Sequence, residues 1–214
     1  MILSKRYFGV YEHNRDFYTL NYSQGSLFGE KVLKFDNQEY RYWDPYKSKL
    51  SAALNKNIEH FPFKNDSNVL YLGASFGNTV SFLSDICVEG NIYAIEKSVR
   101  SFKSLLTVGD HRKNVYPILE DANYPEKYEF FIKDIDILYQ DIAQKNQVDI
   151  FNKNIKYVLS GGYGILALKT KAIDVTKSAK QVLDIERKKI KNLKETVNIE
   201  TYEKEHYILV TKND

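Results

Sequence analysis

The chain contains a single cysteine, Cys87, among its 214 residues. One cysteine permits neither an intrachain disulfide nor a cysteine-based metal cluster. We expect Cys87 to be a small buried hydrophobic residue of a helix rather than a nucleophile. Glycine and proline are also scarce, at 10 and 4 residues, whereas hydrophobic residues make up 43% of the chain. This composition predicts a folded globular protein rather than a disordered one.

Long apolar stretches are missing as well. No segment approaches the ~20 apolar residues that a membrane-spanning helix needs, and the first residues lack the cationic start and apolar stretch of a secretory signal. We therefore expect a cytoplasmic protein that has no membrane partner. The four histidines, His13, His60, His111 and His206, show no metal-ligand spacing, so no metal site is expected.

The excess of positive charge is small, with a formal net charge of +3. A protein that grips RNA alone usually has a stronger basic bias, because each neutralised phosphate releases counterions. Basic residues concentrate at 177–195, where an apolar stripe accompanies them. This pattern favours the solvated face of an amphipathic helix.

The chain divides between residues 47 and 48 into two predicted domains. Residues 1–47 contain short aromatic and β-branched runs separated by turn-forming segments, one of them at 23–26, and they predict a small β-rich domain. Ser48 opens a helix, and from residue 68 strands alternate with helices, which predicts right-handed crossovers and a parallel sheet. Strands are predicted at 69–73, 91–96, 115–119, 135–140, 162–168, 197–202 and 206–211. Helices between them are predicted at 79–87, 98–108, 147–159 and in the basic run.

A glycine-containing turn joins the first of these strands to its helix. Gly73 and Gly77 let the backbone approach a ligand, and the helix N-terminus offers free N–H groups. The turn lacks the complete G-x-G-x-x-G pattern, which disfavours a nicotinamide-dependent reductase and suits a smaller nucleoside ligand. Glu96 ends the next strand about 20 residues after Gly77, where an acid can bind both ribose hydroxyls. A surface ion pair with Lys97 is the alternative.

Two further positions follow strands of the same sheet. Asp121, after the third strand, is placed either to accept a hydrogen bond from an adenine amino group or to cap a turn. Asp141 and Lys169 follow strongly apolar strands, at the edge that forms the ligand crevice. Partial burial there favours an ion pair, and with Lys49 nearby such a pair can orient or deprotonate a hydroxyl. The alternative for Asp141 and Lys169 is a structural salt bridge. His206 is a further candidate, although a lone histidine is more often a core or surface residue than a catalytic one.

The chain resembles the fibrillarin family, in its archaeal form, over nearly its whole length. The segments that carry the resemblance are 28–30, 39–43, 48–50, 73–79, 95–96, 117–119, 121–122, 141–144, 161–164, 173–176 and 202–206. Ser-Lys-Leu at 48–50 and Asp-Ile-Ala-Gln at 141–144 are specific to that family rather than to Rossmann folds at large. The resemblance implies a seven-stranded, Rossmann-like class I methyltransferase domain. It also implies guide-RNA-directed 2′-O-methylation of rRNA or tRNA within a box C/D ribonucleoprotein.

The resemblance also assigns residues and partners. It implies a catalytic tetrad of Lys49, Asp141, Lys169 and His206. It implies S-adenosyl-L-methionine as cofactor, bound at the turn that starts with Gly73 and by Asn78, Thr79, Glu96, Lys97, Asp121, Ala122, Asp141, Ile142, Ala143 and Gln144. The implied partners are a Nop-domain scaffold protein, a kink-turn-binding protein, the guide RNA and its target RNA.

Three positions of the cofactor turn and strand depart from the family. A small residue is usual at Phe76, Thr is usual at Asn78, and Phe is usual at Lys97. These departures motivate an alternative function, a non-catalytic structural subunit of the same kind of particle. The Arg/Gly-rich tail of the nucleolar form is absent, in agreement with the expected cytoplasmic location.

Overall fold

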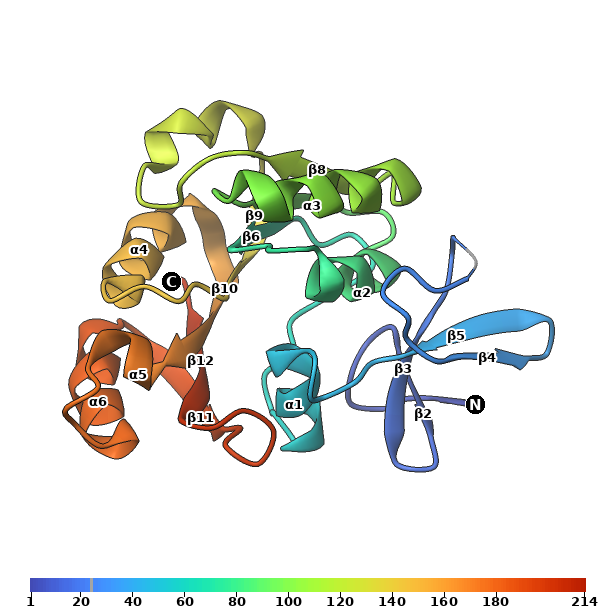
Figure 1. Cartoon of the computed structure of the whole chain (residues 1–214), viewed down its shortest axis with the longest axis horizontal. Helices are drawn as coiled ribbons and strands as arrows, with labels where there is room; N and C mark the ends of the chain where they lie inside the picture. The colour runs from blue at the N-terminus through green and yellow to red at the C-terminus, as the bar shows by residue number, and fades with distance from the viewer. Residues whose placement is uncertain (24) are drawn as a thin grey trace.

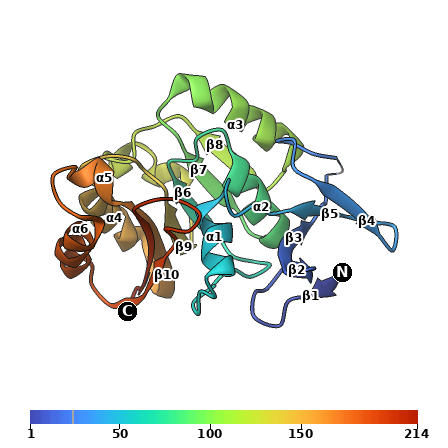
Figure 2. The same cartoon turned by 60° about the horizontal axis from the view of Figure 1, so that its bottom comes forward.

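The computed structural model describes residues 1–23 and 25–214 and contains two β-sheets (Figures 1 and 2). The N-terminal sheet is antiparallel, in the order β1-β2-β3-β5-β4. Its strands are β1 (Ile2–Leu3), β2 (Val10–His13), β3 (Asp16–Leu20), β4 (Val32–Phe35) and β5 (Gln38–Tyr42). The β-rich N-terminal region is confirmed. The aromatic and β-branched runs at 8–11, 17–20 and 32–35 overlap β2, β3 and β4, whereas no such run was predicted at β1 or β5. The predicted turn at 23–26 includes residue 24, which lies outside the described residues.

The larger sheet has seven strands in the order β11-β12-β10-β9-β6-β7-β8. They are β6 (Val69–Leu72), β7 (Ile92–Ile95), β8 (Val115–Ile118), β9 (Ile135–Gln140), β10 (Val158–Lys169), β11 (Leu193–Asn198) and β12 (His206–Lys212). Strands β6 to β10 pair in parallel, whereas β12 runs antiparallel to both β10 and β11. The prediction of a parallel sheet was wrong for β12, because the turn at 199–205 is too short for a crossover.

Helices cover both faces of this sheet. The α-helices are α1 (Lys49–Asn55), α2 (Asn78–Ile86), α3 (Val99–His111), α4 (Gln147–Asn154), α5 (Thr170–Ile173) and α6 (Ala179–Glu186). Short 3-10 helices occupy Pro125–Lys127, Glu129–Phe131, Ile155–Tyr157 and Arg187–Lys189. Successive strand residues point to opposite faces, so Tyr71 joins a core with α1, α2 and α3, and Leu70 joins one with α4 and α6. In the described ranges no helix is long and apolar enough to cross a membrane.

Two helices end earlier than the sequence pattern predicted. In the basic run, α6 ends at Glu186 and β11 already begins at Leu193. Asn192 between them has a φ of 51°, a left-handed conformation that Asn tolerates and that redirects the chain. Strand β11 therefore spans 193–198 rather than 197–202. The helix predicted over 147–159 stops at Asn154, because Val158 already pairs with Ile135 of β9.

A buried ion network attaches the N-terminal sheet to α2. Arg41 of β5 is fully buried, with its Nε 2.6 Å from Glu30 and a terminal nitrogen 2.8 Å from Asp85. Its second terminal nitrogen donates to the Ser81 hydroxyl at 2.8 Å. Asp85 also pairs with Arg112 at 2.7 Å. Since buried charges need such partners, these contacts fix the position of the N-terminal sheet against α2, and through α2 that of the α1 segment.

Candidate active site

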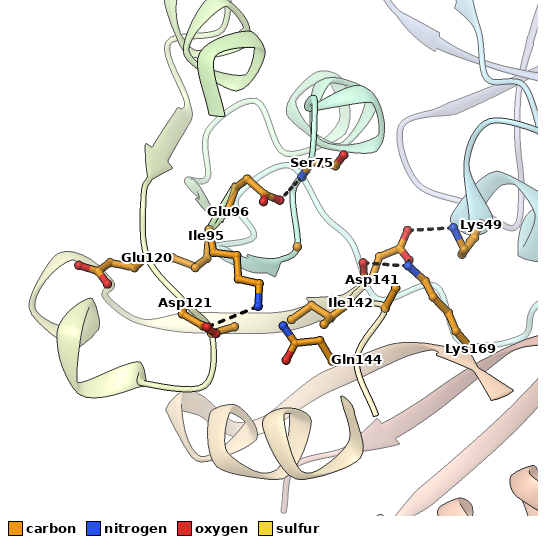
Figure 3. A pocket seen from close by; sticks show the side chains of 14 residues that line it. Lys49, Ser75, Ile95, Glu96, Glu120, Asp121, Asp141, Ile142, Gln144 and Lys169 are labelled. Carbon is orange, nitrogen blue, oxygen red and sulfur yellow. Dashed lines mark hydrogen bonds and ion pairs between the residues drawn. The ribbon is translucent and has the colours of Figure 1, made fainter. Parts of the chain in front are cut away.

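A cavity of about 380 Å³ lies at the carboxyl ends of the central strands (Figure 3). From β8 the chain crosses back to β9 on the other side of β6, and such a switch in strand order leaves a crevice outside the strand ends. The cavity is lined by many of the predicted cofactor residues, namely Gly73, Glu96, Lys97, Asp121, Ala122, Asp141, Ile142, Ala143 and Gln144. Lys49 and Lys169 line it too. Residues that far apart in sequence therefore share one site.

The turn after β6 needs glycine for a steric reason. Gly73 has a φ of 77°, and a Cβ added there would lie 2.8 Å from the carbonyl oxygen of Asp141. Ser75, two residues on, has a φ of 51° and donates its backbone N–H to the Glu96 carboxylate at 2.7 Å. Ser75 lines the cavity, as do Ile95 and Glu120. None of these three was predicted as a site residue from the sequence, although Ser75 lies within the glycine turn.

Glu96 is held rigidly at the end of β7. The residue is 8% exposed, and its two carboxylate oxygens accept hydrogen bonds from the backbone N–H groups of Ser75 and Ser98, both at 2.7 Å. Each carboxylate oxygen can accept a second hydrogen bond. Glu96 therefore presents oriented, unused acceptor capacity to the cavity, as the binding of a ribose diol requires. The alternative of a surface pair with Lys97 is not what the structure shows.

Asp121 caps a turn, which is one of the two roles that its sequence position allowed, and its other oxygen lies in the cavity wall. Its Oδ1 accepts from the backbone N–H of Asn123 at 2.9 Å and thus caps a turn. Its Oδ2 faces the cavity, 3.5 Å from Lys97 Nζ. Desolvation would raise the pKa of Asp121, but the hydrogen bonds from Asn123 and the charge of Lys97 outweigh it and lower the pKa below 3.8. The carboxylate is therefore ionised and able to accept a hydrogen bond from an amino group.

Asn123 joins the two loops that form the cavity walls after β8 and β9. Its side-chain nitrogen donates to Asp121 at 2.8 Å and to Gln144 at 3.1 Å. Its side-chain oxygen accepts from Asn146 at 2.8 Å. Because every donor and acceptor of this amide has a partner, the two walls are held at a fixed separation.

Asp141 lies between two lysines at the end of β9. Its Oδ1 is 2.7 Å from Lys169 Nζ, and its Oδ2 is 3.3 Å from Lys49 Nζ. Figure 3 shows Asp141 between the two lysines. Burial would raise the pKa of Asp141, but the ammonium groups of Lys49 and Lys169 outweigh it and the pKa is lowered. The side chains of Lys169 and Asp141 are each only 16% exposed. The predicted ion pair is thus present, with Lys49 as the second cation.

His206 begins β12 directly opposite Lys169 of β10, so their side chains leave the sheet as cross-strand neighbours. Its Nδ1 lies 2.6 Å from the carbonyl oxygen of Lys204. A carbonyl only accepts, so Nδ1 carries the hydrogen and Nε2 of the neutral ring is an acceptor. Burial lowers the pKa of His206 below its ordinary 6.5, and the charge of Lys49 acts in the same direction. His206 is therefore neutral at pH 7.

Comparison with known proteins agrees with these geometric features. The fibrillarin family model matches residues 2–214. The chain belongs to the fibrillarin family. It is 41% identical, over 90% of its length and 87% of the relative's, to the "Fibrillarin-like rRNA/tRNA 2′-O-methyltransferase" of Thermoplasma volcanium. Among solved structures it is similar to Aeropyrum pernix fibrillarin with natively bound S-adenosyl-L-methionine, with a TM-score of 0.89 and 35% identity over 98% of this chain and 96% of that one.

A second fibrillarin structure, a fibrillarin/Nop5p complex, matches with a TM-score of 0.91 and 34% identity. That match covers 99% of this chain and 100% of the other. The seven-stranded methyltransferase fold is therefore established by both the strand order and the family. The catalytic and cofactor-binding roles of individual residues stay predictions.

The three positions that were expected to depart from the family lie in different places. Phe76 is 47% exposed and does not line the cavity, whereas Lys97 does and reaches across it to Asp121. Asn78 and Thr79, predicted as cofactor contacts, are also outside the cavity lining. Asn78 donates to the carbonyl of Lys47 at 3.0 Å, and Thr79 donates to the Ser48 hydroxyl at 3.0 Å. Both side chains hold the start of α1, and their contacts with the cofactor stay predictions.

In the part of the chain that the structure describes, no group of three or more His, Cys, Asp or Glu side chains is arranged to hold a metal ion.

Proposed function

We propose that this protein is an S-adenosyl-L-methionine-dependent methyltransferase that acts on a ribose 2′-hydroxyl of rRNA or tRNA. The observation that carries the proposal is the Lys49–Asp141–Lys169 cluster on the wall of the cavity that also holds Glu96. The cluster can position a hydroxyl, and Glu96 can position a nucleoside. The name of the Thermoplasma volcanium relative supports the same activity.

The cavity suits the proposed cofactor. Glu96 has acceptor capacity for the two ribose hydroxyls, and the ionised Asp121 suits an amino group of the base. Ile95, Ala122 and Ile142 supply apolar walls for a ring. When bound, S-adenosyl-L-methionine supplies a methyl group activated by a positive sulfonium. The departures at Phe76 and Lys97 do not prevent this arrangement, because Phe76 lies outside the cavity and Lys97 pairs with Asp121 at its wall.

Lys169 is the group that orients the substrate hydroxyl. Its Nζ lies 2.7 Å from Asp141 Oδ1 and 3.2 Å from the Asp141 carbonyl oxygen. A lysine ammonium has three N–H donors, so one remains for the oxygen of the incoming hydroxyl. Asp141 fixes the direction of that donor, and Lys49 fixes Asp141 from the other side. Holding the oxygen in line for attack is the main contribution that such a transfer requires.

We infer that His206, which lies opposite Lys169 but is not among the residues that line the cavity, receives the hydroxyl proton. Its Nδ1–H is bound to Lys204, which leaves Nε2 as an acceptor in the neutral ring. The lowered pKa of His206 keeps the ring neutral at pH 7. The positive charges of Lys49 and Lys169 disfavour a proton on Nε2, which therefore stays an acceptor. His206 therefore acts as a weak base, while Lys49 and Lys169 tune the field around the oxygen.

We further propose that target choice depends on partners. The similarity to fibrillarin in its complex with Nop5p supports a Nop-domain scaffold protein as one of them. A net charge of +3 is small for autonomous RNA binding, which favours a particle in which a kink-turn-binding protein and a box C/D guide RNA supply most of the RNA contacts.

The test is methyl transfer from labelled S-adenosyl-L-methionine to a guided RNA, in a particle reconstituted with the scaffold, the kink-turn-binding protein and box C/D RNA. Label is expected at one paired 2′-hydroxyl and is expected to vanish when that nucleotide is a deoxyribose. Lys169→Met should reduce turnover about 10²- to 10⁴-fold and leave cofactor binding measurable by calorimetry.

Lys171→Met is the matched control, because Lys171 lies two residues away, is 45% exposed and pairs with Glu205 rather than Asp141. It should retain turnover. An assembled wild-type particle that binds the cofactor and transfers no methyl would contradict the proposal in favour of a structural subunit. Full turnover by Lys169→Met would contradict only the role of Lys169 and would leave the proposed activity intact.

A further inference from the structure

Segment 171–195 holds the positive excess of the chain. It contains eight of the 31 Lys and Arg residues and four of the 28 Asp and Glu residues, so the rest of the chain has one more acidic residue than basic. We define the basic face as these eight cations: Lys171, Lys177, Lys180, Arg187, Lys188, Lys189, Lys191 and Lys194. All eight are exposed. Figures 1 and 2 show α6, which belongs to this segment, on the side of the molecule remote from the N-terminal sheet.

The solvated face of a helix does not account for most of these cations. Helix α6 ends at Glu186 and contains one of them, Lys180. Five others follow the helix, on the 3-10 helix Arg187–Lys189, at the turn beside Asn192, and at the start of β11. The cations therefore gather at a corner of the fold where the chain reverses direction, and the helix predicted from the basic run does not explain them.

This corner is anchored to the elements on either side of it. The Asn152 amide of α4 donates to the Lys189 carbonyl at 3.0 Å. The Thr211 hydroxyl of β12 donates to the Lys191 carbonyl, and the N–H of Lys212 donates to the Asn192 carbonyl at 3.3 Å. The backbone that carries the cations is thus held in place.

The nearby carboxylates neutralise only half of the basic face. Within the described residues, ion pairs engage four of the cations: Lys171 with Glu205, Lys177 with Asp174, Arg187 with Asp184 and Lys189 with Glu186. The other four, which have no such pair there, are Lys180, Lys188, Lys191 and Lys194. Glu195 is only 14% exposed and accepts from the backbone N–H groups of Glu59 and His60. The adjoining α4 segment adds the exposed Lys153 and Lys156 against the exposed Asp149.

This distribution of charge suits a polyanion. Like charges at one corner repel each other, and a bound anion relieves that repulsion. Lysine binds phosphate as a compact point charge, and each neutralised phosphate releases counterions. The centres of protein–protein interfaces are depleted in lysine, so a phosphate backbone fits this face better than a protein does. Phosphates remain accessible in a duplex, so the RNA needs no unpaired base to bind here.

The basic face extends from the cavity to the opposite edge of the sheet. Lys171 lies two residues after Lys169, whereas Asn192 meets Lys212 at the far end of β12. Strand β12 runs from His206 to Lys212, which corresponds to about 20 Å at about 3.3 Å per residue. A ligand that covers the face must therefore be a polymer rather than a nucleoside.

We propose that the basic face, with Lys188 and Lys191 at its corner, binds the phosphate backbone of paired RNA at a distance from the methylated ribose. This inference rests on the proposed function and adds an RNA-docking surface to it. Phosphate contacts fix position and carry no sequence information. The surface therefore orients the guide–target duplex relative to Lys169 and does not choose the target.

The test measures how tightly this chain binds two partner complexes in the absence of S-adenosyl-L-methionine. The first contains the scaffold, the kink-turn-binding protein, the guide RNA and the paired target RNA, and the second is the scaffold protein alone. Each phosphate contact contributes about 0.9 to the slope of log K against log salt. Lys188→Gln/Lys191→Gln should therefore reduce the steepness of that slope by about 2 for the RNA complex.

The same variant gives a second expected number. Its loss of affinity for the RNA complex, relative to the wild type, should be about tenfold larger at about 50 mM salt than at about 200 mM. For the scaffold alone, the variant should bind like the wild type. Cofactor affinity, measured by calorimetry, should also be unchanged.

Lys103→Gln/Lys113→Gln is the matched control. It removes the same charge from two exposed lysines, on α3 and just after it, beside β8 at the opposite edge of the sheet. The control should keep the wild-type slope. Lys188→Arg/Lys191→Arg retains both charges and should keep the slope as well.

Three results would overturn the proposal. They are an unchanged slope for Lys188→Gln/Lys191→Gln, an equal loss of affinity for the scaffold alone, which would make the face a protein contact, and an equal change in the control, which would assign the effect to net charge. Binding does not require methyl transfer, so the expected slope change in a particle that transfers no methyl would support the surface and contradict the proposed function. An unchanged slope in a particle that methylates would do the reverse.

Discussion

Replacing Arg41 by Met should destabilise the protein by breaking the buried network between β5 and α2. Arg41 has no exposed side-chain area and pairs with Glu30 at 2.6 Å and Asp85 at 2.8 Å. Met fills a similar volume but offers no donor. Glu30 then loses its cation, and Asp85 keeps one cation, Arg112, and the hydrogen bond from the Thr19 hydroxyl. An uncompensated buried charge is the costly outcome of such a change.

The magnitude follows from Glu30. Burial would raise its pKa, but Arg41, the Ser26 hydroxyl and the Phe28 N–H outweigh it and lower the pKa from 4.5 to about 2. At about 1.4 kcal/mol per pKa unit this favours the folded state by about 3 kcal/mol at pH 7, of which Arg41 supplies a large part. With the added penalty at Asp85, we expect Arg41→Met to lower the free energy of unfolding by about 3–5 kcal/mol.

The assay is urea unfolding followed by tryptophan fluorescence. Trp43 is the single tryptophan of the chain, is fully buried, and stacks on Phe82 of α2 with ring centroids 5.3 Å apart. Its emission therefore reports on the same interface. Lys34→Met is the control, because the Lys34–Glu39 pair lies in the same sheet with Lys34 80% exposed. Exposed pairs contribute about 0–1 kcal/mol.

The pH dependence supplies a second check. A carboxylate with a depressed pKa stabilises the fold above its unfolded-state pKa, and this contribution is lost as the pH falls through the folded-state value. For Glu30 the window runs from 4.5 down to about 2. The stability difference between wild type and Arg41→Met should therefore shrink over that range. A loss below 1 kcal/mol at pH 7, or a difference that widens in acid, would refute the reasoning.

Two other changes test the site. In the wild type, the rate should decrease in acid with a midpoint below pH 6.5, because burial lowers the pKa of His206. His206→Gln should remove this decrease. An unchanged decrease would assign the titrating proton to another group. Thr79→Val deletes the hydrogen bond to Ser48, which holds the start of α1. Because one hydrogen bond contributes about 1 kcal/mol, turnover should fall by up to about tenfold. Cofactor affinity should be unchanged. Weaker cofactor binding in the calorimeter would instead make Thr79 a direct contact.

Local sequence determined most of the helices and strands. Ser48 caps α1 as predicted, because its hydroxyl accepts from the N–H of Ser51. The apolar runs that became β6, β7, β9 and β10 were placed to within a few residues at most positions, since a strand buried on both faces has a continuous apolar sequence. Element ends were predicted less well where the deciding event was a single backbone angle, as at Asn192.

The resemblance to fibrillarin, carried by short motifs, identified the family and pointed to the residues around the cavity. Glu96, Asp121, Asp141 and Lys169 were also predicted without the resemblance. Each follows a predicted strand, and the carboxyl ends of parallel strands meet at one edge of the sheet. Ser75 was not predicted, because the neighbouring residues do not indicate that this serine has a positive φ.

Only the tertiary structure decided which partners these side chains have. Asn78 and Thr79 fit a helix N-terminus beside a cofactor, yet the arrival of α1 gives both of them hydrogen bonds to Lys47 and Ser48. The antiparallel direction of β12 places His206 opposite Lys169, although the two are distant in sequence. Composition and local pattern fix what each segment can form. Which charges meet depends on the packing of segments against one another, because burial makes an ion pair necessary only once the surrounding chain has excluded water.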